Sequence, residues 1–152
     1  MERLQFKIEI NAPARKVYRA MLGLDDKATY EHWASAFGPS STYEGEWHTS
    51  NKIYFVGTDE NGRRGGMISK VAVHVPEEFV SLQNVGFIDG DNEITTGPEV
   101  EAWLDGHENY RFVEESGRTT LMVEVEVPDD HVRFFKDAYP VGLDRLKRLV
   151  EK

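Results

Sequence analysis

Apolar side chains recur every three to four positions near the end of the chain, which predicts a helix from about His131 to Val150. Its apolar face carries Phe135, Tyr139, Gly142, Leu143, Leu146 and Leu149 or Val150. Pro140 removes one backbone donor in the middle of this helix, so we expect a kink there. A kinked helix laid across a curved sheet need not pack flat and can leave a hollow, and hollows are where small apolar molecules bind.

Most of the remaining chain alternates between apolar and polar residues, which is typical of half-buried strands. The first strand holds Leu4 to Ile10, and Asn11 is a candidate cap for a helix that begins after Ala12-Pro13. A second short helix carries Tyr30 and Trp33. Further strands are predicted at residues 43–47, 52–58, 67–75, 79–85, 108–115 and 118–127.

The segment from Gly86 to His107 lacks a clear period and contains five Gly or Pro residues. We interpret it either as a functional lid or as an exposed, variable connection. Consecutive strands joined by tight turns predict an antiparallel sheet. The sequence therefore predicts one α+β domain over residues 1–152, with six to seven strands wrapped around the long C-terminal helix and two short helices after the first strand.

Composition is that of an ordinary globular protein, with 39% hydrophobic and 30% charged residues among 152. A formal net charge of -9 without a basic stripe argues against nucleic-acid binding. The chain has no cysteine, which excludes disulfides, thiolate catalysis and zinc–thiolate sites. Neither a signal peptide nor a membrane span is recognisable, so we expect a cytoplasmic location and no membrane partner.

Several segments, taken in order and spacing, resemble the START-like (SRPBCC) superfamily. They are FKIEINAPARKVY (residues 6–18), YEHW (30–33), GEW (45–47), IYF (53–55), GGMISKV (65–71), PEEFV (76–80), QNVG (83–86), EAW (101–103), ENYRF (108–112), GRTTLMV (117–123) and PVGLDRLKRLVEK (140–152). The branch that looks most similar holds the bacterial proteins related to activators of heat-shock-protein ATPase.

The resemblance implies a helix-grip fold with a cavity between the sheet and the last helix, used for lipids, polyketides or other apolar ligands. It supplies no universal catalytic motif. Two positions depart from the pattern. Ser50-Asn51 replaces a glycine turn that relatives often carry, and Asn84 stands where many carry a histidine.

Candidate catalytic and metal-binding groups are sparse. The five histidines are scattered without metal-ligand spacing, and His74 alternates with Val73 and Val75, which predicts a solvent-facing side chain. Ser69 lacks the glycine pattern of a nucleophile elbow. The glycine-rich stretch 61–66 joins two strands, so we interpret it as a hairpin rather than a phosphate cradle. We expect no metal and no cofactor.

Carboxylates could do acid or base chemistry if the irregular segment covered the cavity. Glu99, Glu101 and Asp105 lie near Trp103, and Glu108 precedes Tyr110. An acid facing a ligand there would have a raised pKa. We favour the plainer interpretation, a solvated acidic loop.

Aromatic residues give the stronger signal. The candidate ligand-binding residues are Trp33, Trp47, Tyr54, Met67, Gln83, Trp103, Tyr110, Phe135, Tyr139 and Leu143. The helix-grip fold that the resemblance implies would bring them to the cavity, and together they favour binding of a small apolar ligand over catalysis.

Two alternatives stay open. One is a module that binds a protein partner or forms a homodimer, and it calls for an exposed apolar patch. The other is a cyclase- or aromatase-type enzyme. A buried acid–tyrosine or acid–histidine pair in the cavity would favour it, and a wholly apolar lining would exclude it.

Overall fold

The computed structural model describes residues 1–152 and contains a single eight-stranded antiparallel sheet. Its strands run in the order β1-β8-β7-β5-β4-β3-β2, and β6 pairs with β5 beside this path. The strands are β1 (Glu2–Ile10), β2 (Thr42–Gly45), β3 (Lys52–Thr58), β4 (Arg64–Val75), β5 (Phe79–Asp89), β6 (Asn92–Ile94), β7 (His107–Glu115) and β8 (Arg118–Val127).

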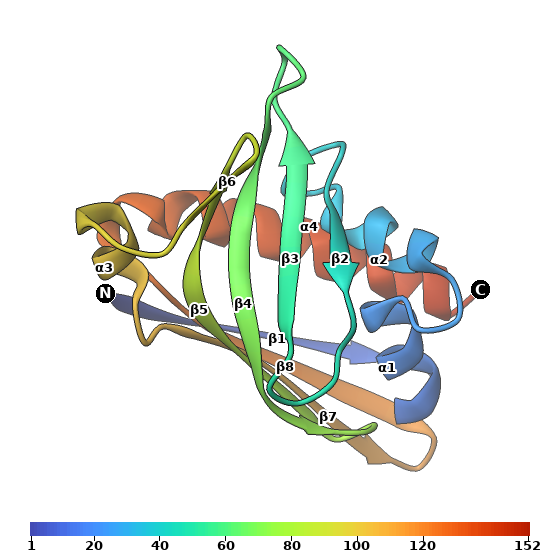
Figure 1. Cartoon of the computed structure of the whole chain (residues 1–152). Coiled ribbons are helices and arrows are strands. Elements are labelled where there is room, and N and C mark those ends of the chain that lie inside the picture. The colour runs from blue at the N-terminus through green and yellow to red at the C-terminus, as the bar shows by residue number, and fades with distance from the viewer.

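Four α-helices accompany the sheet, and the longest crosses its concave side (Figure 1). The helices are α1 (Ala14–Leu22), α2 (Lys27–Ala34), α3 (Pro98–Trp103) and α4 (Val132–Val150), the last preceded by a 3-10 turn, η1 (Asp129–His131). In Figure 1, α1 and α2 lie at one end of α4, and α3 lies near its other end. None of these helices has the length and apolar character needed to cross a membrane.

The α+β architecture predicted from the sequence is confirmed. In β8 the alternation places Leu121, Val123 and Val125 in the buried core. These residues and the inward face of β1 pack against α1 and α4. Leu143 and Leu146 of α4 are buried in this contact. The period-two and period-3.6 patterns therefore meet in one core.

Helix α4 continues without a break on both sides of Pro140. Gly142 lies where α4 meets α2, and a Cβ atom there would approach the carbonyl oxygen of Trp33 to 2.9 Å. The missing side chain lets the two helices come this close. Trp33 is anchored in turn by its indole Nε1, which donates a 2.9 Å hydrogen bond to the carbonyl oxygen of Met21.

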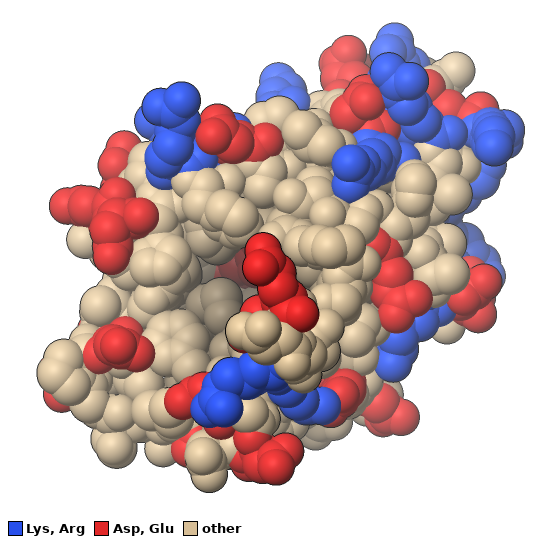
Figure 2. All heavy atoms as spheres, turned by 90° about the horizontal axis from the view of Figure 1, so that it is seen from above, with Lys and Arg blue, Asp and Glu red and all other residues tan.

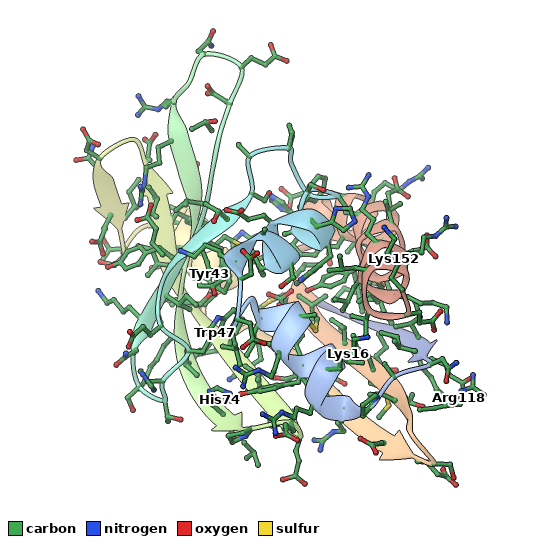
Figure 3. All side chains as sticks on the ribbon, turned by 90° about the vertical axis from the view of Figure 1, so that its right-hand side faces the viewer. Lys16, Tyr43, Trp47, His74, Arg118 and Lys152 are labelled. Atoms are coloured by element: carbon green, nitrogen blue, oxygen red, sulfur yellow. The ribbon has the colours of Figure 1, made fainter.

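The prediction that His74 faces solvent is wrong. A register shift in β4 between Val71 and Val73 moves the following residues by one position, so Val73 and Val75 are each 41% exposed and His74 turns inward. Its ring nitrogens lie 2.6 Å from the hydroxyl of Tyr18 and 2.6 Å from the carbonyl oxygen of Trp47. Figure 3 shows His74 and Trp47 beside α1.

The segment from Gly86 to His107 is more regular than its sequence suggests. Strand β5 continues to Asp89 and turns into β6, and α3 follows after Gly97. The elements β6 and α3 have three and six residues, which is too short to display a period.

Two terminal details also differ from expectation. Asn11 does not cap α1, because the cap position is Pro13; instead its backbone N–H donates to the carboxylate of Glu151. The hairpin between β3 and β4, with its turn around Asp59 to Gly62, extends beyond the rest of the sheet (Figure 1).

Candidate functional site

A pocket of about 380 Å³ lies between the concave face of the sheet, α2, Trp103 and the first half of α4. Figure 2 shows it as a hollow in the surface, with acidic atoms visible inside and the Lys and Arg side chains outside. The pocket is larger than a packing defect, since native cores contain few voids larger than a water molecule.

Aromatic rings form a large part of its wall. Ten of the 26 lining residues are aromatic: Tyr30, Trp33, Phe37, Phe55, Phe87, Trp103, Tyr110, Phe134, Phe135 and Tyr139. Neighbouring rings meet edge to face or tilted. The ring centroids of Phe37 and Tyr139 are 4.9 Å apart, and those of Phe87 and Trp103 are 6.0 Å apart. These contacts hold the wall in one arrangement.

Glu108 supplies a carboxyl group to the pocket lining from β7. Burial raises its pKa from the ordinary 4.5 to about 7, and a hydrogen bond with Tyr110 opposes this rise only in part. No Lys or Arg contributes to the shift. Near neutral pH this carboxyl is therefore divided between its neutral and charged forms.

Two tyrosines, Tyr110 and Tyr30, lie near Glu108. Burial raises the pKa of Tyr110 well above its usual value, with further contributions from Glu108 and Tyr30. Burial also raises the pKa of Tyr30, and the negative charge of Glu108 adds to this effect. Both phenols stay protonated at any physiological pH, so they act as hydrogen-bond donors within the pocket.

Asn84 carries an amide without partners. Its side chain is only 6% exposed and lines the pocket, yet neither Oδ1 nor Nδ2 has a hydrogen-bond partner. It lies opposite Ser69 of β4, and its backbone N–H donates to Gly106. A buried amide left unpaired costs about 1–3 kcal/mol, so a site of this kind calls for a partner from outside the chain.

The lining has acidic side chains but no Lys or Arg. The lining contains two carboxylates, Glu108 and Glu126, and two histidines, His107 and His131, but no Lys or Arg. Glu126 accepts a 3.1 Å hydrogen bond from the backbone N–H of His107 and is partnered in this way. No group of three or more His, Asp or Glu side chains is arranged to hold a metal ion.

Six of the ten residues proposed from the sequence line the pocket. They come from five elements, and they are Trp33, Met67, Trp103, Tyr110, Phe135 and Tyr139. The fold brings these residues together from different elements. Trp33 lies on α2 and Trp103 on α3, Met67 and Tyr110 lie on the concave face of the sheet, and the other two lie on α4.

The other four lie elsewhere. Trp47 is buried, and its Nε1 donates a 3.0 Å hydrogen bond to the carbonyl oxygen of Leu22. Leu143 is buried in the main core further along α4. Tyr54 and Gln83 point to the opposite side of the sheet, where Tyr54 donates to Glu93 and Gln83 to Asp105.

The expectation of a solvated acidic loop holds for three of the four acidic residues considered near Trp103 and Tyr110. Glu99, Glu101 and Asp105 are exposed, whereas Glu108 faces the pocket. Alternation along β7 carries a signal for this, because Tyr110 and Phe112 occupy the same face as Glu108. The unpaired state of Asn84 has no such signal, because it depends on every neighbour of the amide.

No protein-family model matches the chain, and no curated protein sequence matches it. Solved structures with a similar fold do match. The solution structure of the Aha1 dimer from Colwellia psychrerythraea is 21% identical, with a TM-score of 0.69, over 99% of this chain and 97% of that one. Protein CV1439 from Chromobacterium violaceum is 15% identical, with a TM-score of 0.72, over 100% and 99% of the two chains.

Protein NE0264 from Nitrosomonas europaea is a third similar structure, 13% identical with a TM-score of 0.71, over 98% of this chain and 94% of that one. At these identities the likeness shows a shared fold. It extends over nearly the whole chain, so the sheet, the helices and their order are common to these proteins.

Proposed function

We propose that this protein binds a small, mainly apolar ligand in the pocket between its sheet and α4. The observation that carries the proposal is an aromatic-walled pocket of about 380 Å³ with unpaired polar groups inside it. Ligand pockets of proteins combine an apolar lining with a few directional polar groups. Burial of ligand surface at roughly 25 cal/mol per Å² supplies the affinity, and Asn84, Glu108 and Tyr110 orient the ligand.

Titration of the protein with N-phenyl-1-naphthylamine, a fluorescent fatty alcohol and a polyphenol tests this proposal. We expect saturable one-site binding of at least one of the three. Replacing Met67, which lines the pocket, with Trp should weaken that binding by occupying part of the space. Val73→Trp is the matched control, because Val73 lies on the same strand but is 41% exposed outside the pocket. Failure of all three probes to bind saturably would contradict the proposal.

An enzyme is the second candidate, and one observation favours it. The acid–tyrosine pair Glu108 and Tyr110 lines the pocket, which meets the criterion that we set for a cyclase- or aromatase-type site. A carboxyl with a pKa of about 7 has the proton affinity of an efficient general acid or base. Mass spectrometry of a recovered ligand distinguishes the two functions, since binding alone returns it unchanged.

Binding to a partner is the third candidate. The similar fold of the Aha1 dimer, and the branch of activators of heat-shock-protein ATPase that the sequence resembles, support it. Sedimentation of the free protein tests the homodimer. The cytoplasmic location, the absence of a cofactor and the exclusion of nucleic-acid and membrane partners stay predictions.

A further inference from the structure

We propose that the ligand of this pocket carries a protonated amine, which binds between Glu108 and Asn84 while its apolar body fills the aromatic part of the pocket. This inference rests on the proposed function and specifies the chemical class of the ligand. Three independent features of the lining support it.

The charge of the lining is the first feature. Among 26 lining residues there is no Lys or Arg, and Glu108 is a carboxylate without a cationic partner. A ligand with a carboxylate or phosphate group would bring like charge to Glu108 in a poorly solvated place. An ammonium group instead provides the opposite charge that this carboxylate lacks.

The unpaired amide is the second feature. Strand β5 pairs with β7 so that Leu82 lies opposite Glu108. Asn84, two residues after Leu82, is therefore the diagonal neighbour of Glu108 on the same face of the sheet. The Cα atoms of such neighbours lie about 7–8 Å apart, so both side chains reach into the same part of the pocket, within range of one ligand nitrogen. An ammonium donates three hydrogen bonds, and Glu108 and the Oδ1 of Asn84 are acceptors available for two of them.

The aromatic rings around this place are the third feature. Tyr30 and Trp33 meet edge to face with ring centroids 5.3 Å apart, and the centroids of Trp33 and Tyr110 are 6.4 Å apart. Tyr30 and Tyr110 both lie near enough to Glu108 to respond to its charge. A cation bound at Glu108 therefore lies among aromatic rings, whose faces attract positive charge.

Three ligands that share one apolar body test the inference: 2-(1-naphthyl)ethylamine, 2-(1-naphthyl)ethanol and 1-naphthylacetate. Their dissociation constants for the whole protein are measured by calorimetry at pH 8. We expect the amine to bind at least tenfold more tightly than the alcohol, because a hydrogen bond to a charged group is worth that much. We expect the carboxylate to bind most weakly.

Glu108→Gln should remove the preference for the amine, so that the amine binds no more tightly than the alcohol does to the same variant. Glu124→Gln is the control, because it removes the same charge from the exposed outer side of β8. Equal or tighter binding of the alcohol or the carboxylate by the unmodified protein would overturn the inference while supporting the proposed function. So would a preference for the amine that survives in Glu108→Gln. Binding of none of the three would count against both.

The pH dependence gives a second readout. The amine stays protonated below pH 9, whereas Glu108, with a pKa of about 7, must lose its proton to bind it. The affinity should therefore fall about tenfold per pH unit below pH 7 and level off above pH 8. Glu108→Gln should abolish this dependence, which separates Glu108 from the other titratable groups of the lining: Tyr30, Tyr110, Glu126, His107 and His131.

Discussion

Glu108 occupies an inward position of β7, because the alternation that turns Tyr110 and Phe112 toward the core turns Glu108 toward it as well. A half-buried carboxyl without a cation is an unfavourable choice for stability alone. Its raised pKa is the measurable sign of that burial.

Glu108→Gln should alter the pH dependence of stability. Because the folded-state pKa of Glu108 is about 7 and lies above its ordinary 4.5, the folded protein holds an extra proton between these values. The contribution of Glu108 to the free energy of unfolding therefore falls as pH rises from about 4.5 to 7. Urea unfolding should show Glu108→Gln to be more stable than the unmodified protein at pH 8, by about 3 kcal/mol, and similar to it at pH 4.5.

Glu124→Gln provides the comparison, since it changes net charge equally at a half-exposed position on the other face of the sheet, outside the pocket. A constant difference between Glu108→Gln and the unmodified protein across pH 4.5–8 would mean that Glu108 titrates as an ordinary surface acid.

At the residue level, the fold that the resemblance implies was the guide to the pocket. It led to aromatic residues such as Trp33 and Tyr139, which line the pocket, and their contact with a ligand stays a prediction. Tyr54 and Gln83 alternate as regularly, and the pattern alone does not say which face of the sheet carries the pocket. The amide of Asn84 could not be found this way, because its lack of partners is a property of the assembled site.

At the scale of elements, the long strands and helices were predictable because they extend over enough residues to show a period. The additional strand β6 and the helix α3 have only three and six residues, too few to show a repeating pattern. The reversal at His74 has another cause: the irregularity in β4 between Val71 and Val73 displaces every later side chain to the other face.

Close packing of α4 on α2 makes Gly142 sensitive to substitution. In Gly142→Ala the new Cβ would approach the Trp33 carbonyl oxygen to 2.9 Å and its ring to 3.3 Å. Overpacking of about 1–3 kcal/mol outweighs the gain of about 1 kcal/mol in helix propensity, so we expect a net loss of about 1 kcal/mol in the free energy of unfolding. Displacement of Trp33 should also weaken probe binding in the pocket.

Val141→Ala is the neighbouring control, because Val141 is 46% exposed on the same helix, and its effect should stay within about 0.5 kcal/mol. A Gly-to-Ala change stabilises a helix at an open position. If Gly142→Ala also stabilised this protein, α4 and α2 would not be in such close contact.

At the scale of the whole molecule, the α+β architecture followed from the order of the predicted elements. Consecutive strands and one long helix leave few ways to cover an apolar sheet face. The volume of the pocket could not be predicted in this way, because it depends on residues from α2, α3, α4 and six strands at once.

Net charge also acts over the whole molecule. With a formal charge of -9, the protein attracts cations from a distance, and salt screens that attraction. Stopped-flow fluorescence should therefore show the association rate constant of 2-(1-naphthyl)ethylamine falling about threefold between 20 mM and 500 mM salt. The uncharged 2-(1-naphthyl)ethanol should show no such fall. Equal salt dependence for the two compounds would contradict steering by the protein's charge.

The projecting turn between β3 and β4 offers an opening for engineering. A side chain at Gly62 would meet no atom within 4 Å, so additional residues introduced beside it would extend into solvent. Gly62 does not belong to the pocket lining. A short epitope or a fluorescent reporter peptide inserted at this loop would therefore label the protein without occupying its pocket.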